Sequence, residues 1–305
     1  MPVISLERVV ITVADLDGAI AFFHDGLGLT VGPVRSVKDA GWNGFLGLDA
    51  ETHMLAADIQ FDGEALTLAA FNPTGAPYPR PRASNDPWFE HVALVAGDIE
   101  AVWSRLEESN PESVTVGGPV VLPPNTGRVT AFKFRDTEGH PLELISFPDG
   151  VGDPRWQKGG PGIRGFDHTA IVVADLDRSL AFYTELLGMR VGGRSVNQGP
   201  EQDHLDDLSG CLVDVVALQP GDQQTPHLEL LYYRQPPESD PVPPPQANDV
   251  ASVRQVYRVE GLEALVDSLK SAGVTFVSEG LVALAENEHG AAVRDPDGHM
   301  VVLLD

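Results

Sequence analysis

The stretch LERVVITVADLDGAIAFFHDGLGL at residues 6–29 returns, little changed, as FDHTAIVVADLDRSLAFYTELLGM at residues 166–189. Each copy begins with alternating and β-branched residues, which predicts a strand. Asp-Leu-Asp then predicts the start of a helix, because a carboxylate in the first turn caps free N–H groups and favours the helix dipole. Glycine, at Gly28 and Gly188, predicts where that helix ends. A repeat of this kind constrains the fold more than any other feature of the chain.

Two weaker copies complete the pattern. Residues 88–106 (WFEHVALVAGDIEAVWSRL) and 251–269 (ASVRQVYRVEGLEALVDSL) again predict a strand followed by an amphipathic helix. Both halves of the chain then close on one signature, RDTEGHPLELISF at 135–147 and RDPDGHMVVLLD at 294–305. In each, a turn joins two predicted strands. The chain is therefore predicted to hold four degenerate copies of one βαβββ unit.

Three segments rich in proline and glycine, at 72–87, 148–162 and 234–249, separate the copies and disfavour both helix and central strand. They place the four units at 4–72, 86–148, 163–234 and 250–305, in two modules at 1–150 and 151–305. The predicted fold class is α+β, with curled, mixed but mostly antiparallel sheets and helices outside them.

Composition excludes several classes of function. The net charge of −25 over 305 residues argues against nucleic acid and anionic membranes as partners. No apolar run approaches the roughly 20 residues that span a bilayer. The single cysteine, Cys211, rules out an intrachain disulfide and a cysteine-based zinc cluster. Since the first residues show no export signal, we expect a cytoplasmic location.

The unit openings (His-x-x-x-x-Val-x-Asp-Leu) and closings (Asp-Pro-Asp-Gly-His-x-x-Glu-Leu) resemble the vicinal oxygen chelate superfamily of glyoxalases, extradiol dioxygenases and bleomycin-resistance proteins. The resemblance covers essentially the whole chain. It implies paired units whose sheets curl around a cup, with metal ligands on the first and last strands of each unit. It also implies one divalent metal ion that chelates neighbouring oxygens of a small-molecule substrate.

The implied ligand positions are filled unequally. The second unit has His91 and Glu143 there, and the third has His168 and Glu229. The outer units have residues that ligate metals poorly; these are Arg8 and Thr67 in the first unit and Arg254 and Val302 in the fourth. Pairing in sequence order would leave two half-sites, whereas pairing the second unit with the third gives one complete set.

We therefore expect a metal cup made by units two and three, within one chain or across a homodimer. Two imidazoles and two carboxylates suit Zn²⁺, Ni²⁺, Co²⁺, Mn²⁺ or Fe²⁺. A carboxylate buried in an otherwise apolar strand is costly without such a partner, and Glu143 and Glu229 both lie in LEL contexts.

Three functions fit this set. The first is a metal-dependent lyase or isomerase resembling glyoxalase I or an epimerase, in which the metal stabilises an enediolate and Glu143 or Glu229 moves the proton. The second is an Fe(II) extradiol dioxygenase, which usually has two histidines and a single carboxylate. The third is a non-catalytic small-molecule binder, which has no need of metal ligands.

Three further features carry weaker predictions. His227 shares strand parity with Glu229 and faces either the cup or a strand edge. The segment GPEQDHLDDLSG at 199–210 is interpreted as a solvated loop, with a pocket lid as the alternative. Arg8, Arg254 and Arg258 would meet if units one and four face each other, as an ion-pairing module or as an anion pocket.

Overall fold

The computed structural model describes residues 2–37, 40–88, 90–222, 224–237, 242–285 and 288–305. The first half contains β1 (Val3–Val13), α1 (Leu16–Ala21), β2 (Arg35–Val37), α2 (Ala40–Phe45), β3 (His53–Gln60), β4 (Ala65–Asn72), β5 (Glu90–Ala96), α3 (Ile99–Glu107), β6 (Glu112–Ser113), β7 (Val120–Val121), β8 (Thr130–Arg135) and β9 (Pro141–Ser146). The second half contains β10 (Ile163–Val172), α4 (Leu176–Leu180), β11 (Arg190–Gln198), α5 (Pro200–Asp206), β12 (Leu212–Gln219), β13 (His227–Gln235), β14 (Val253–Val259), α6 (Leu262–Ser271), β15 (Val282–Ala285), β16 (Glu288–Arg294) and β17 (Met300–Leu304). Helices α1 and α4 both continue into a π-helical turn, at Phe22–Gly26 and Ala181–Leu186.

The strongest repeat of the sequence is also a structural repeat. Asp15 and Asp175 cap α1 and α4, each accepting a hydrogen bond of 3.0 Å from the backbone N–H three residues later. Gly28 and Gly188 end the two helical segments with φ of 74° and 75°, a conformation that favours glycine. The predicted helix starts and ends are thus confirmed in both copies.

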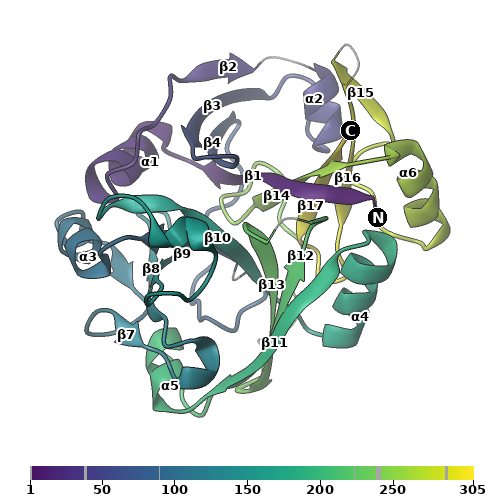
Figure 1. Cartoon of the computed structure of the whole chain (residues 1–305). Coiled ribbons are helices and arrows are strands. Elements are labelled where there is room, and N and C mark those ends of the chain that lie inside the picture. Colours follow the sequence, from purple (N-terminus) through teal and green to yellow (C-terminus); the bar gives the residue numbers. More distant parts are fainter. Residues whose placement is uncertain (1, 38–39, 89, 223, 238–241, 286–287) are drawn as a thin grey trace.

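The strands form two mixed sheets, and each sheet takes its strands from both halves of the chain (Figure 1). One sheet runs β15-β16-β17-β14-β1-β4-β3-β2 and joins the first unit to the fourth. The other runs β11-β12-β13-β10-β5-β9-β8-β6, with β7 paired to β8, and joins the second unit to the third. The N-terminal strand β1 lies antiparallel against β14, and β10 lies antiparallel against β5. The boundary near residue 150 therefore separates sequence modules but not sheets, and it stays a prediction.

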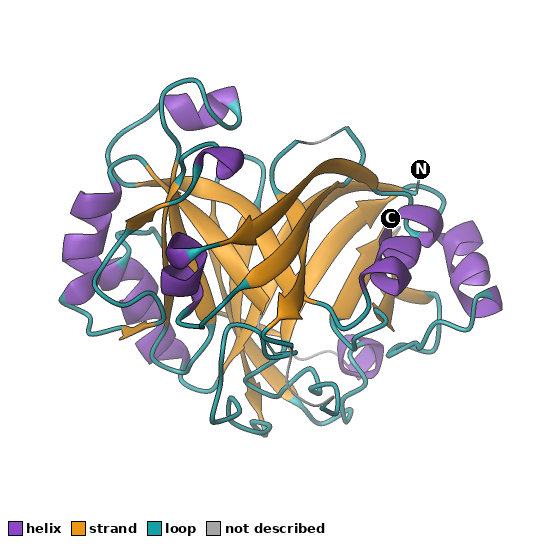
Figure 2. Ribbon diagram, turned by 90° about the horizontal axis from the view of Figure 1, so that it is seen from below, coloured by secondary structure: helices purple, strands orange, loops and turns teal. Residues whose placement is uncertain are grey.

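The strands fill the middle of the molecule and the helices lie mainly around its outside (Figure 2). This arrangement confirms the predicted α+β class. One large apolar cluster underlies both sheets, with Phe23, Leu94, Phe166 and Leu303 among its fully buried members. In the described part of the chain, no helix has the length and apolar character needed to cross a membrane.

The two central strand pairs share an irregularity that matters for the site. In the β10–β5 pairing the register shifts between Phe166 and His168, and in the β1–β14 pairing it shifts between Leu6 and Arg8. Such a bulge inserts one residue and lets consecutive side chains escape strict alternation. It therefore changes which residues reach the inner face of each sheet.

Candidate metal centre

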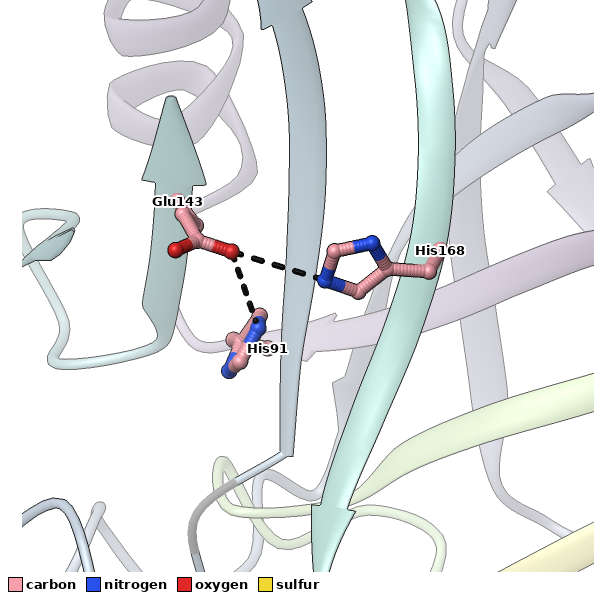
Figure 3. Close-up of side chains that lie close together, drawn as sticks. All are labelled: His91, Glu143 and His168. Atoms are coloured by element: carbon pink, nitrogen blue, oxygen red, sulfur yellow. Dashed lines mark ion pairs between the residues drawn. The ribbon is translucent and has the colours of Figure 1, made fainter. Parts of the chain in front are cut away.

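Three of the predicted ligands lie together on adjacent strands (Figure 3). His91 on β5 and His168 on β10 both point their imidazoles at Glu143 on β9. The Oε2 atom of Glu143 lies 3.3 Å from Nε2 of His91 and 3.5 Å from Nε2 of His168. All three residues are buried, so water does little to screen their interaction.

Glu229 on β13 joins this group through His168. Its Oε2 atom lies 3.6 Å from Nε2 of His168. His227, two residues earlier on the same strand, lies with Nε2 3.5 Å from Oε1 of Glu229. The predicted strand parity of His227 and Glu229 is therefore confirmed, and His227 faces the same space as the four predicted ligands.

The two imidazoles differ in protonation. Burial opposes the charge on His168, but Glu229, Asp167 and Glu143 outweigh it and raise the pKa of His168 well above its usual value, so a metal ion would have to displace that proton. Burial lowers the pKa of His91 and favours its neutral form, which is the form that binds metals. Burial raises the pKa of Glu143, but the neighbouring imidazoles of His168 and His91 outweigh it and hold that pKa well below its usual range. Burial likewise opposes the charge on Glu229, and His168 and His227 again outweigh it, so the pKa of Glu229 is lowered. Both carboxylates therefore stay ionised at neutral pH.

Asp167 orients His168 from the other side of the ring. Its Oδ2 atom lies 3.1 Å from Nδ1 of His168, and its Oδ1 accepts a 2.7 Å hydrogen bond from Nε1 of Trp156. Because an ionised carboxylate only accepts, Nδ1 of His168 carries the proton and Nε2 turns its lone pair toward Glu143 and Glu229 when the ring is neutral. A carboxylate behind a ligating histidine is the usual support in metal sites.

The spacing of the donor atoms fits a shared metal ion. Two donors each about 2.1 Å from one ion lie about 3.0 Å apart at octahedral angles and about 3.4 Å apart at tetrahedral angles. Charge-assisted hydrogen bonds are shorter, at about 2.7–2.9 Å. The contacts of Glu143 and Glu229 with the imidazoles, at 3.3–3.6 Å, match the spacing of ligands better than that of hydrogen-bonded pairs. The residues present therefore fit a divalent ion.

These side chains line a cavity of about 380 Å³, the first cup, which helix α5 covers. Gln202 and Leu205 of α5 line this cavity, so residues 199–210 do not form the expected solvated loop. A buried ion pair fixes the helix in place, because Nζ of Lys133 on β8 lies 2.7 Å from Oδ1 of Asp206. The hydroxyl of Tyr233 donates to the same carboxylate at 3.0 Å.

The structure brings His91, Glu143 and His168 within ligating reach of one another, and Glu229 lines the same cavity and contacts His168. Their role in binding metal stays a prediction. Sequence reasoning missed Asp167 and Lys133. Alternation along β10 would direct Asp167 away from His168, and only the bulge lets both line the cavity. Lys133 pairs directly with Glu143 across β8 and β9, a register that the sequence does not reveal. His140 lies in the closing turn and supports it, with Nδ1 2.7 Å from Oδ2 of Asp136.

Comparison with known families agrees with the fold. The family model for the Glyoxalase/Bleomycin resistance protein/Dioxygenase superfamily matches residues 5–144 and 165–303. The chain belongs to this superfamily. The two matched regions are the two halves of the chain, in keeping with the internal repeat.

Individual relatives are more distant. The chain is 26% identical over 186 residues to lactoylglutathione lyase GLX1 of Arabidopsis thaliana, a match that covers 60% of this chain and 54% of that protein. It is 30% identical over 138 residues to a "probable lactoylglutathione lyase" of Vibrio parahaemolyticus, which covers 45% of this chain and 87% of that protein. The chain thus spans about half the length of the Arabidopsis relative. The crystal structure of glyoxalase I from Zea mays superposes with a TM-score of 0.65 at 19% identity, covering 98% of this chain and 92% of that one, which shows a common fold.

Proposed function

We propose that the chain is a glyoxalase-type, metal-dependent lyase or isomerase that acts on a small molecule with two neighbouring oxygens. The convergence of two imidazoles and two carboxylates inside one cavity carries this proposal. The relatives named lactoylglutathione lyase support the glyoxalase type. A binder that only sequesters its ligand has no need of these buried charges, each of which costs free energy.

His91, Glu143, His168 and Glu229 would hold the metal, and Asp167 would orient His168. A divalent ion supplies Lewis acidity, which makes a carbon next to a bound carbonyl easier to deprotonate. The protein's own part is to accept that proton and to return it at the neighbouring position. A carboxylate in the cavity can do both.

Glu229 is the better placed of the two carboxylates for this proton transfer. Its side chain is 22% exposed, against 7% for Glu143, and its two oxygens contact His168 at 3.6 Å and His227 at 3.5 Å. Glu143 uses one oxygen to contact both His91 and His168, the two imidazoles of the predicted ligand set. We assign Glu229 to proton transfer and Glu143 mainly to holding the ion.

The walls of the first cup favour an uncharged, polar substrate. Amide and hydroxyl side chains line much of the cavity, among them Asn197, Gln202, Gln219 and Thr126. Among the described lining residues there is no arginine, and Asp206 already pairs with the ammonium of Lys133. Glutathione carries two carboxylates, which need cationic partners. The cavity therefore suits a smaller neutral substrate better than a glutathione adduct.

A matched pair of substrates tests both parts of the proposal. The hemithioacetals of methylglyoxal with mercaptoethanol and with glutathione share a reacting centre and differ in charge. We expect turnover, and solvent deuterium exchange at the reacting carbon, to be faster with the neutral adduct in the metal-loaded protein. Faster turnover of the glutathione adduct would overturn the substrate class alone. Exchange with neither adduct, or oxygen uptake with a catechol, would overturn the reaction type.

Two variants separate the carboxylates. Glu229→Gln should abolish exchange while most of the metal stays bound, because three donors remain. Glu143→Gln should lower metal content first, because it removes the donor that contacts both imidazoles. The reverse pattern would exchange the two assignments.

A further inference from the structure

The sheet of units one and four forms a second cup with the same plan as the first. Its cavity, of about 340 Å³, lies at the strands that correspond to those of the metal centre. Arg8, Thr67, Arg254 and Val302, the four counterparts of the predicted ligands, all line it. So does Glu7, which lies at the bulge of β1 as Asp167 does in β10. The second cup has kept its shape while its ligating residues have been replaced.

Part of the lining of the second cup is apolar. Its apolar lining includes Trp42 of α2, Leu46 just after that helix, Met54 of β3, and Val302 and Leu304 of β17. Apolar surface left facing water costs roughly 25 cal/mol per Å², so a module kept only for stability gains by closing such a space. The open cavity therefore suits a ligand with an apolar body.

The lining also contains a cation, Arg8, that is not the nearest partner of either neighbouring carboxylate. Asp58 pairs most closely with Arg35, at 2.5 Å, whereas Arg8 lies 3.5 Å from it. Glu7 pairs most closely with Arg258, at 2.7 Å, whereas Arg8 lies 3.8 Å from it. Each neighbouring carboxylate thus has another arginine as its nearer partner.

Arg8 also has donors to spare. Its one short contact is a 3.1 Å hydrogen bond from Nη1 to Oγ1 of Thr67. Within the described residues, its other nitrogens make no hydrogen bond, and the side chain is 30% exposed. The lining holds three arginines and two glutamates, and Asp58 pairs with Arg35 and more distantly with Arg8. A planar guanidinium in this position suits a carboxylate.

We propose that the second cup is a binding site for small carboxylic acids with an apolar body. The carboxylate pairs with Arg8, and the body packs against Trp42, Met54 and Val302. The site is separate from the metal centre. It needs no metal, because the four counterparts of the predicted ligands include no histidine and no carboxylate. It does not depend on which reaction the first cup performs.

Phenylbutanoate and its neutral amide are the probes, titrated into the full metal-loaded chain and followed by calorimetry and ligand-observed NMR. We expect the carboxylate to bind about tenfold or more tightly than the amide, since a charge-assisted hydrogen bond contributes at least that much. Arg8→Gln should remove this preference. Val302→Phe should fill the cavity and abolish binding of both probes.

Val215→Phe is the matched control, because Val215 lines the first cup as Val302 lines the second. It should leave phenylbutanoate binding unchanged, as should removal of metal by a chelator. Absence of binding, equal affinity of acid and amide, or loss of binding in Val215→Phe but not in Val302→Phe would each overturn the proposal. If Val302→Phe fails to fold by circular dichroism, Arg8→Gln and the amide decide the matter.

Discussion

Replacing Lys133 by methionine tests how α5 is held over the first cup. The ammonium of Lys133 lies 2.7 Å from Asp206, and the two side chains are 5% and 0% exposed. Removing one partner of a buried ion pair costs about 3–5 kcal/mol, because the other charge is left buried. Asp206 keeps hydrogen bonds from Tyr233 and Gln202, so we expect the lower end, about 3 kcal/mol.

The assay is equilibrium unfolding in urea, with Arg234→Met as control. Arg234 pairs with Asp214 at 2.6 Å, but its side chain is 50% exposed, so its loss should cost less than about 1 kcal/mol. Adding Asp206→Asn to Lys133→Met removes the stranded charge and should recover much of the lost stability. A cost below about 1 kcal/mol for Lys133→Met, or a double variant less stable than the single one, would refute the reasoning.

Two further predictions follow from the described contacts. Asp167→Asn leaves either His168 or Trp156 without its acceptor, so metal affinity should fall about 10–100-fold. The assay is competition with a chelator, and Asp153→Asn, also at the cavity wall, should change the affinity little. The buried pair of Asp136 and His140 should make stability depend on pH in both directions. Burial opposes the charge on both side chains, but the charge and hydrogen bond of the partner outweigh it. The pKa of Asp136 is therefore lowered from 3.8, and the pKa of His140 is raised from 6.5. Stability from Asp136 is therefore lost as pH falls below 3.8, and stability from His140 is lost as pH rises above 6.5 through its folded pKa. Melting temperatures of His140→Gln measured across this range should lack the high-pH limb and show a weaker low-pH limb, because backbone N–H groups still donate to Asp136. A profile identical to that of the parent protein would contradict this.

The repeat made most of the fold predictable. Matching stretches around Asp15 and Asp175 identify equivalent units, and the unequal ligand positions argue for crossed pairing. The sheet order joins the same units. Alternation also places Glu229 and His227 on one face, because no bulge interrupts β13 between them.

The parts that the sequence did not reveal depend on long-range register. Asp167 reaches the first cup only because the register of β10 shifts against β5, and no local sequence pattern predicts that shift. Lys133 lies in the apolar stretch AFKF, where its partner Asp206 is 73 residues away. Residues 199–210 look like a solvated loop because they are acidic, yet Leu205 and Asp206 are buried against β8. The composition of a segment indicates its polarity, but its contacts with distant strands determine whether it is buried.

Metal content is the most direct test of the central claim, that the sheet shared by units two and three holds one divalent ion. The measurement is elemental analysis of the purified full chain, of His91→Ala/His168→Ala and of Arg8→Gln. We predict one ion per chain in the parent protein and in Arg8→Gln, and essentially none in the double histidine variant. A parent protein without metal, or a double variant that keeps its full complement, would contradict the account.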